Sequence, residues 1–165
     1  MSQMAPTYTL RLAKQDFKFS VAHFTIFAAG RAEPLHGHNY RLALELEGSV
    51  AGEYGLLADC DEWKRAARAV CATLDDKVLV AAASPHVDCR EEGGDLVVAF
   101  AGRTYRFPES ETLRLPLANV SMEMLARWAW ERLAREAPRG AIERLTVEIE
   151  ETPGQLCRFA APLGG

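Results

Sequence analysis

The sequence predicts an α+β domain in which two helices cover one face of an antiparallel sheet. Several stretches, such as Tyr8–Leu12 and Leu145–Glu151, alternate apolar and polar residues, which is the period of a half-buried strand. Two other stretches, following Asp59 and Asn119, place apolar residues at helical spacing. The order along the chain is two strands, a helix, a hairpin, a helix and a strand. That order favours an antiparallel sheet with its helices on one side.

In the first part of the chain, Tyr8–Leu12 and Phe17–Thr25 are expected to be strands, or one long strand broken near Lys14–Asp16. The segment Ile26–Leu35 contains glycine, proline and charged residues, so it is expected to be a loop. Asn39–Glu47 alternates again and is expected to be the next strand.

In the middle of the chain, Asp59 or Asp61 is expected to cap a helix that runs to about Leu74. The short apolar run Val78–Val80 follows it. Turn residues divide His86–Phe107 into strand-like runs, which predicts a hairpin.

The last part of the chain is expected to hold a helix and the final strands. The helix begins near Asn119 or Ser121 and ends at Pro138–Gly140. The strand Leu145–Glu151 follows, and Gln155–Phe159 can extend the sheet after a turn.

Composition excludes several classes of protein. The chain has 165 residues, of which 48% are hydrophobic and 25% charged, and its net charge is −4. These values suit one soluble domain over residues 1–165 and give no sign of a nucleic-acid partner. No apolar run approaches the ~20 residues of a membrane span, and Met1–Pro6 lacks the pattern of a signal peptide. The four cysteines form no Cys-x-x-Cys pair, so we expect them to be reduced and the protein to be cytoplasmic.

Three of the four histidines suggest a metal site. His36 and His38 stand two positions apart at the entrance of a predicted strand, where such residues share a face about 6.6–6.8 Å apart. His23 lies in another strand-like run. Three imidazoles with a free fourth position are typical of catalytic zinc. Two alternatives remain open: His36 and His38 as surface residues, and His23 as a hydrogen-bonded core histidine. We assign His86, in a loop, no role.

Four motifs in order along the chain resemble the 6-pyruvoyl-tetrahydropterin synthase and 6-carboxy-tetrahydropterin synthase family. Together they extend over nearly the whole chain, and the second is the most specific. They are Phe19-Ser20-x-Ala22-His23, His36-Gly37-His38-Asn39-Tyr40, Asn119-x-Ser121-x-Glu123 at the start of a helix, and Glu151-Thr152 at the end of a strand.

The resemblance implies a T-fold, whose sheets assemble in trimers into a barrel, with active sites between subunits. It implies a homotrimer or homohexamer that acts on a small pterin. The expectation of no nucleic-acid or membrane partner comes from the charge and the apolar runs instead. It carries over His23, His36 and His38 as ligands of Zn²⁺.

The resemblance also implies how a pterin is held. Glu151 carries over as the carboxylate that grips the ring, because adjacent pterin N–H groups can donate to both oxygens of an ionised acid. Ser121 and Glu123, from the third motif, carry over as further candidate substrate-binding residues. Glu151 can also be a solvated strand end, with Glu148 or Glu150 in the binding position instead.

The chain departs from the better-known members in its candidate catalytic residues. Those members use a cysteine shortly before His-Gly-His and an Asp-His pair after the first helix. Here the loop before His36 contains no cysteine, and Asp75 and Asp76 stand where the pair is expected. One family branch, associated with shortening the side chain of a dihydroneopterin derivative, has a glutamate instead, and Glu33 matches its spacing.

The resulting hypothesis is a zinc-dependent lyase or aldolase. The metal acidifies hydroxyls of the pterin side chain, and Glu33 acts as base, with a pKa that rises if the loop is desolvated. Asp75 and Asp76 are candidates for a pair that shares a proton, or are exposed acids at a helix end. Two alternatives are a non-catalytic zinc- and pterin-binding homologue and a 6-carboxy-tetrahydropterin synthase, which the missing cysteine disfavours.

Overall fold

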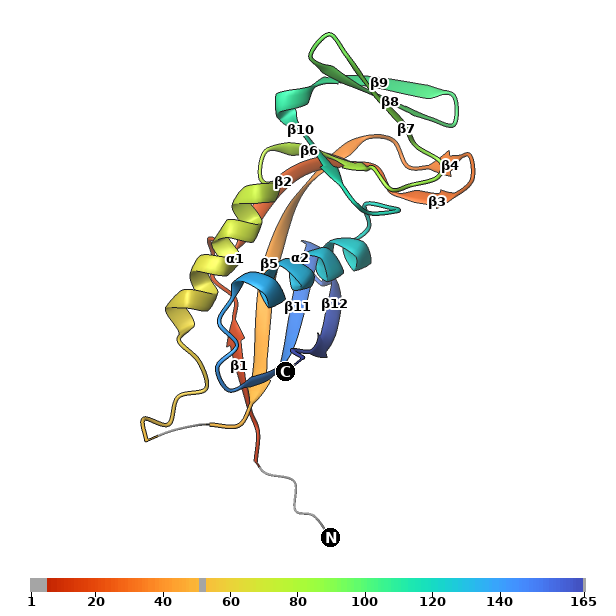
Figure 1. Cartoon of the computed structure of the whole chain (residues 1–165). Helices are drawn as coiled ribbons and strands as arrows, with labels where there is room; N and C mark the ends of the chain where they lie inside the picture. The colour runs from red at the N-terminus through yellow and green to blue at the C-terminus, as the bar shows by residue number, and fades with distance from the viewer. Residues whose placement is uncertain (1–5, 51–52, 165) are drawn as a thin grey trace.

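The computed structural model describes residues 6–50 and 53–164, and its main element is a curved seven-stranded sheet (Figure 1). The expectation of one domain over residues 1–165 includes 1–5, 51–52 and 165, which lie outside the described residues. The strands run in the order β10-β6-β2-β5-β11-β12, and β1 pairs with the C-terminal part of β5. Their bounds are β1 Tyr8–Leu12, β2 Lys18–His23, β5 His36–Gly48, β6 Lys77–Ala81, β10 Thr112–Leu115, β11 Ile142–Thr152 and β12 Gln155–Pro162.

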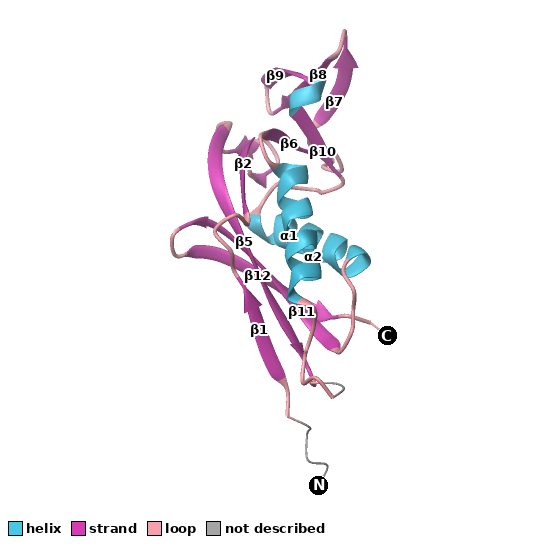
Figure 2. Ribbon diagram, turned by 90° about the vertical axis from the view of Figure 1, so that its left-hand side faces the viewer, coloured by secondary structure: helices cyan, strands magenta, loops and turns pink. Residues whose placement is uncertain are grey.

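Two helices in the described part of the chain lie on the same face of this sheet, as predicted (Figure 2). In α1 (Cys60–Leu74), the Asp59 carboxylate accepts a hydrogen bond from the backbone N–H of Asp61 and caps the first turn. In α2 (Met122–Glu136), the Ser121 hydroxyl accepts a longer bond, 3.4 Å, from the N–H of Met124. Both helices therefore begin at capping residues that the sequence named.

The core lies between the helices and one face of the sheet. Alternate residues of β5 and β11, among them Leu44, Leu46, Val147 and Ile149, are buried there against the helices. This arrangement follows from the period of two in the strands and the period of 3.6 in the helices. No helix in the described ranges is long and apolar enough to cross a membrane.

The prediction of a purely antiparallel sheet is wrong at β6. This strand pairs parallel with β10 and, over two residues, parallel with β2. Parallel neighbours need a long crossover connection, and here α1 and the segment between β6 and β10 provide it. The sheet is therefore mixed.

Two further small sheets depart from the prediction. The expected loop before His36 contains a short hairpin of β3 (Ile26–Ala28) and β4 (Arg31–Ala32), with Gly30 at φ 75° in the turn. The expected two-stranded hairpin is a three-stranded meander of β7 (Asp88–Glu92), β8 (Asp95–Phe100) and β9 (Arg103–Pro108). Figure 1 shows the meander at the end of the molecule where β3 and β4 also lie.

Candidate active site

Antiparallel pairing of β2 and β5 brings the three histidines together. His23 stands opposite His36, and Val21 stands opposite His38. Because side chains two positions apart share a face, all three imidazoles project to the helix-bearing side of the sheet. One nitrogen from each ring lies within 4.8 Å of the others, so these residues can hold a metal ion.

The hydrogen bonds that His23 and His36 make through Nδ1 leave the lone pairs of their Nε2 atoms available to a metal. Nδ1 of His23 lies 3.1 Å from the Val120 carbonyl oxygen, and Nδ1 of His36 lies 2.8 Å from that of Pro34. A carbonyl oxygen only accepts, so each Nδ1 donates and each Nε2 keeps its lone pair. The Nε2 atoms of His36 and His38 converge to 2.8 Å. Ligand atoms at about 2.0–2.1 Å from a tetrahedral zinc ion lie about 3.3 Å from one another. Small rotations of the imidazoles would bring their nitrogens to that spacing.

The environment of His23 favours its neutral form. The residue is fully buried, and burial, followed by the neighbouring His36 imidazole, holds the pKa of His23 below its ordinary value. A metal binds neutral imidazole, so this shift is in the direction that ligation needs.

Glu151, at the end of β11, lies beside the imidazoles. Its Oε1 accepts a hydrogen bond of 2.8 Å from the Tyr40 hydroxyl and lies 3.3 Å from Nε2 of His38. Its Oε2 accepts from the side-chain amide of Gln155 at 2.9 Å. Tyr40 is fully buried, and its hydroxyl also lies 3.0 Å from Nε2 of His23. Burial and the bond to Glu151 raise the pKa of Tyr40 well above its ordinary value, so its hydroxyl stays a donor.

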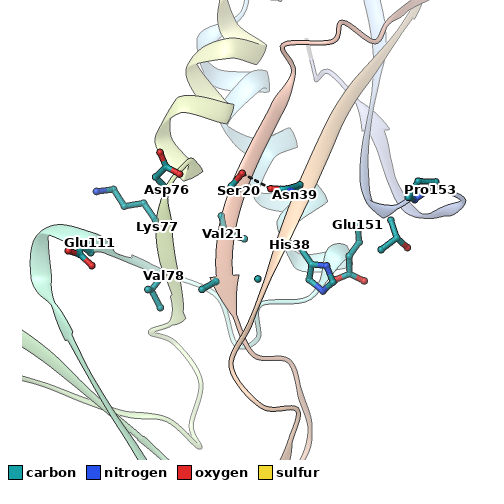
Figure 3. Close-up of a pocket in the computed structure, with 13 residues that line it drawn as sticks. Ser20, Val21, His38, Asn39, Asp76, Lys77, Val78, Glu111, Glu151 and Pro153 are labelled. Carbon is teal, nitrogen blue, oxygen red and sulfur yellow. Dashed lines mark hydrogen bonds and ion pairs between the residues drawn. The ribbon is translucent and has the colours of Figure 1, made fainter.

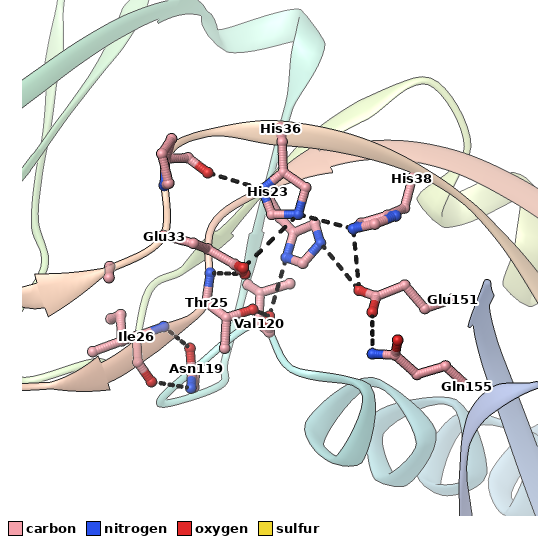
Figure 4. Close-up of polar contacts among 12 residues, drawn as sticks. His23, Thr25, Ile26, Glu33, His36, His38, Asn119, Val120, Glu151 and Gln155 are labelled. Atoms are coloured by element: carbon pink, nitrogen blue, oxygen red, sulfur yellow. Dashed lines mark hydrogen bonds and ion pairs between the residues drawn. The ribbon is translucent and has the colours of Figure 1, made fainter.

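Glu33 follows β4 and lies on the other side of the imidazoles from Glu151 (Figure 4). Its Oε2 is 4.0 Å from Nε2 of His36, and its Oε1 accepts from the backbone N–H of Thr25 at 2.8 Å. Burial on its own raises the pKa of Glu33, but the Thr25 hydrogen bond and the imidazoles of His36 and His23 outweigh it. The net pKa lies below its ordinary value, contrary to the rise expected from desolvation, and the carboxylate is ionised at neutral pH.

A cavity of about 630 Å³ adjoins this cluster (Figure 3). His38 and Glu151 line it at one end, and Asp76 and Lys77 line it at the other. Ser20, Val21 and Asn39 lie between these ends in Figure 3, and Gly37 also lines the cavity. A cavity of this size suits a small ligand.

The two candidate aspartates differ in position. Asp75 ends α1, and its Oδ1 accepts a hydrogen bond of 2.7 Å from the backbone N–H of Ser20. Asp76 has a left-handed backbone, at φ 55°, and its N–H donates to the Ser20 carbonyl. Among the described residues, no hydrogen bond joins the two carboxylates, and only Asp76 lines the cavity.

The two other candidate substrate-binding residues lie at the start of α2, and neither lines the cavity with Glu151. The Ser121 hydroxyl caps the helix. Glu123 is exposed in its first turn. Ser121 therefore has a structural role as the cap of α2. Glu123 makes no contact with the three imidazoles among the described residues.

Sequence reasoning named two residues in its motifs without giving them the contacts that support the cluster. Tyr40 stood in the histidine motif, two positions after His38, so the strand period could have placed it beside the imidazoles. Asn119 pairs its side-chain amide with both backbone groups of Ile26 at 2.9 Å, which joins the start of α2 to β3. Nothing in the local sequence signals that contact, because the partners are 93 positions apart.

The sequence of this chain is similar to those of known proteins. Residues 12–162 match the family model for 6-pyruvoyl tetrahydropterin synthase. A Pyrococcus abyssi protein, given provisionally as a 6-carboxy-5,6,7,8-tetrahydropterin synthase, is 28% identical over 82% of this chain and 81% of its own length. A Methanocaldococcus jannaschii protein with the same provisional name is 26% identical over 84% of this chain and 86% of its own.

Solved structures are also similar. The crystal structure of 6-pyruvoyl tetrahydropterin synthase from Plasmodium vivax has a TM-score of 0.90 and 25% identity, covering 96% of this chain and 99% of that chain. A variant of the same Plasmodium vivax enzyme, described as a catalytic residue mutant with glutamate replaced by alanine, has a TM-score of 0.90 at 24% identity, with the same coverage.

Proposed function

The chain belongs to the 6-pyruvoyl tetrahydropterin synthase family, and we propose that it is a zinc-dependent lyase acting on the side chain of dihydroneopterin or its phosphate. The observation that carries the proposal is the convergence of three imidazoles, with ligand atoms within 4.8 Å, beside an ionised carboxylate. Neutral nitrogen ligands with an adjacent base are the parts that metal-assisted proton abstraction needs.

Each group in the cluster has a proposed task. Zinc would be held by Nε2 of His23, His36 and His38 and would supply a Lewis acid that acidifies hydroxyls of the side chain. Glu33 accepts the proton, since its Oε2 faces the imidazoles while its Oε1 is held by Thr25. The description of the Plasmodium vivax variant gives that enzyme a catalytic glutamate, which supports a glutamate base here.

We propose that Glu151 holds the pterin ring. Its carboxylate lines the cavity and is oriented by donors on both oxygens, from Tyr40 and Gln155. Glu33 and Glu151 lie on opposite sides of the imidazoles (Figure 4), so a side chain placed at the metal would lie between the two carboxylates, although Glu33 does not line the cavity. Asp76, in the same cavity, is the better placed of the two aspartates for a contact with substrate. Ser121 and Glu123 remain weaker candidates.

Two other functions stay as alternatives. The provisional names of the curated relatives favour a 6-carboxy-tetrahydropterin synthase, and the loop without cysteine argues against it. A non-catalytic zinc- and pterin-binding homologue would keep the histidines and Glu151 without turnover.

Product analysis separates the three functions. The zinc-loaded protein is incubated with dihydroneopterin and its phosphates, and the pterin products are identified by mass spectrometry. A pterin with a shortened, hydroxymethyl side chain supports cleavage by the proposed lyase. A 6-carboxy product supports the alternative synthase, and binding without any product supports the non-catalytic homologue.

We also propose that the chain assembles into a homotrimer or homohexamer. The strand order ends at β10 and β12, and β1 pairs only with β5 among the described strands, so these strands keep edges that closure into a barrel with other copies would pair. Sedimentation at micromolar concentration tests this, because a species of 18.2 kDa would contradict it.

A further inference from the structure

The meander of β7, β8 and β9 packs against the segment that carries Glu33. Apolar side chains from both sides form a second hydrophobic cluster, separate from the main core. Phe24, at the start of that segment, lies with its ring centroid 5.9 Å from those of Phe100 and Tyr105. Ala32 and Leu35, on either side of Glu33, pack against the same cluster. The meander therefore packs against and supports the loop that carries Glu33, the proposed base.

One polar side chain crosses from the meander to the loop. Arg103, the first residue of β9, donates from Nη1 to the Glu33 carbonyl oxygen at 2.9 Å and from Nη2 to that of Ala32 at 2.8 Å. Arg103 lies on the same face of β9 as Tyr105 and Phe107, whose side chains enter the cluster. The planar guanidinium can hold two adjacent carbonyl groups at once, which a lysine cannot match.

The other hydrogen bonds of Glu33 are with Thr25. The backbone N–H of Glu33 donates to the Thr25 carbonyl oxygen at 3.1 Å, and the Thr25 N–H donates to the Glu33 carboxylate at 2.8 Å. Thr25 is linked to the three imidazoles, because its hydroxyl and the His23 imidazole both donate to the Val120 carbonyl oxygen. Arg103 thus fixes, from the opposite direction, a backbone that is otherwise held at Thr25.

We infer that Arg103 is a positioning residue that holds the Glu33 carboxylate at its working distance from the three imidazoles. Through Arg103 the meander contributes to the proposed reaction. This inference rests on the proposed function of Glu33 as base. Arg103 acts on the backbone of the loop and does not touch the imidazoles, so metal binding is independent of it. A misplacement of about 1 Å in a catalytic group can lower turnover by about 10²-fold.

The test compares Arg103→Met with a matched control, Arg106→Met. Methionine keeps the unbranched apolar stem and removes both hydrogen bonds. Arg106 lies on the outer face of β9, where its guanidinium bonds to Glu92 and Asp95 within the meander. We expect Arg103→Met to lower kcat by about 10²-fold with zinc content and pterin affinity unchanged. Arg106→Met should leave kcat unchanged.

A double-mutant cycle shows whether Arg103 works through Glu33. In a Glu33→Gln background, Arg103→Met should cause no further loss of kcat, because the group it positions is already gone. Independent losses that multiply would overturn the inference, and so would equal losses in the Arg103→Met and Arg106→Met proteins.

A second measurement does not need turnover. Hydrogen exchange of the peptide covering residues 24–35 should become faster in Arg103→Met and stay at the wild-type rate in Arg106→Met. Unchanged exchange in Arg103→Met would overturn the inference whatever the enzyme does. If exchange responds while the wild-type protein converts no dihydropterin, the loop contact stands, the proposed function fails, and the positioning role is rejected with it.

Discussion

Replacing Glu33 by glutamine isolates its proposed role as base. Glutamine has the shape of glutamate, and its side-chain oxygen can still accept the hydrogen bond from the Thr25 N–H. The backbone contacts of Glu33 with Thr25 and Arg103 involve no side-chain atom of Glu33 and remain. The loop should therefore keep its conformation. The change removes the negative charge 4.0 Å from Nε2 of His36 and the capacity to take up a proton.

The expected magnitude follows from that single loss. One acid–base group contributes about 10²–10⁴-fold to a rate, which corresponds to about 2.7–5.5 kcal/mol of activation free energy. We expect kcat of the Glu33→Gln protein to fall by that factor. Zinc content and pterin affinity should stay at wild-type values, since neither the imidazoles nor Glu151 is altered. Steady-state kinetics with the active dihydropterin, metal analysis and calorimetry measure the three quantities.

An exposed glutamate provides the control. Glu62, in the first turn of α1, forms an ion pair of 3.9 Å with Arg65 and no other among residues 6–50 and 53–164, and Glu62→Gln removes the same charge without touching the site. Turnover of Glu33→Gln within a few-fold of wild type would refute Glu33 as base. Inactivation of the wild-type protein by thiol alkylation, without unfolding, would point to a cysteine instead.

Three further predictions concern the metal, the pterin and the charged face of the sheet. His38→Ala should lose tight zinc binding, while His86→Ala keeps full zinc by metal analysis; a full complement in His38→Ala would exclude that residue as a ligand. Glu151→Gln should weaken pterin binding by about 2–4 kcal/mol in calorimetry, because an amide offers a donor to the ring N–H groups; equal affinity would move the role to another acid. The Arg11 guanidinium, aided by Arg158, holds the pKa of Glu148 below its ordinary value of 4.5. A carboxylate whose pKa is lowered in the folded state stabilises the fold at pH values above its ordinary pKa. This contribution is lost as the pH falls through the folded-state pKa. The difference in unfolding free energy between wild type and Glu148→Gln, from urea titrations, should therefore shrink on acidification, and a constant difference would contradict this.

Local patterns predicted most elements of the fold and could not predict their neighbours. The capping residues Asp59 and Ser121 and the period of two in β11 were enough to place those elements within a few residues. The direction of β6 is different, since a short apolar run pairs equally well in either direction. Its parallel partners are set by the crossover segments before and after it.

The candidate site shows the same division. The histidine pair came from its spacing at the start of a strand, and the role of Glu151 came only from the resemblance to the family. Arg103 could not be found that way, since it contacts a carbonyl group 70 positions earlier and carries no motif of its own. Residues that support a site through backbone groups leave little signal in a single sequence.

The placement of the histidines on neighbouring strands has a consequence for how the proposed zinc site would form. His23 and His38 are 15 positions apart, on strands joined by the β3–β4 segment, so their encounter closes a short loop at small entropic cost. Glu151 joins only when β11 pairs with β5, 111 positions after Tyr40. If these histidines hold zinc as proposed, the ion would find all three ligands once residues up to 38 are available, and it would then hold β2 against β5. On the proposed function, the metal would then stabilise the pairing of β2 with β5 as well as supply the Lewis acid.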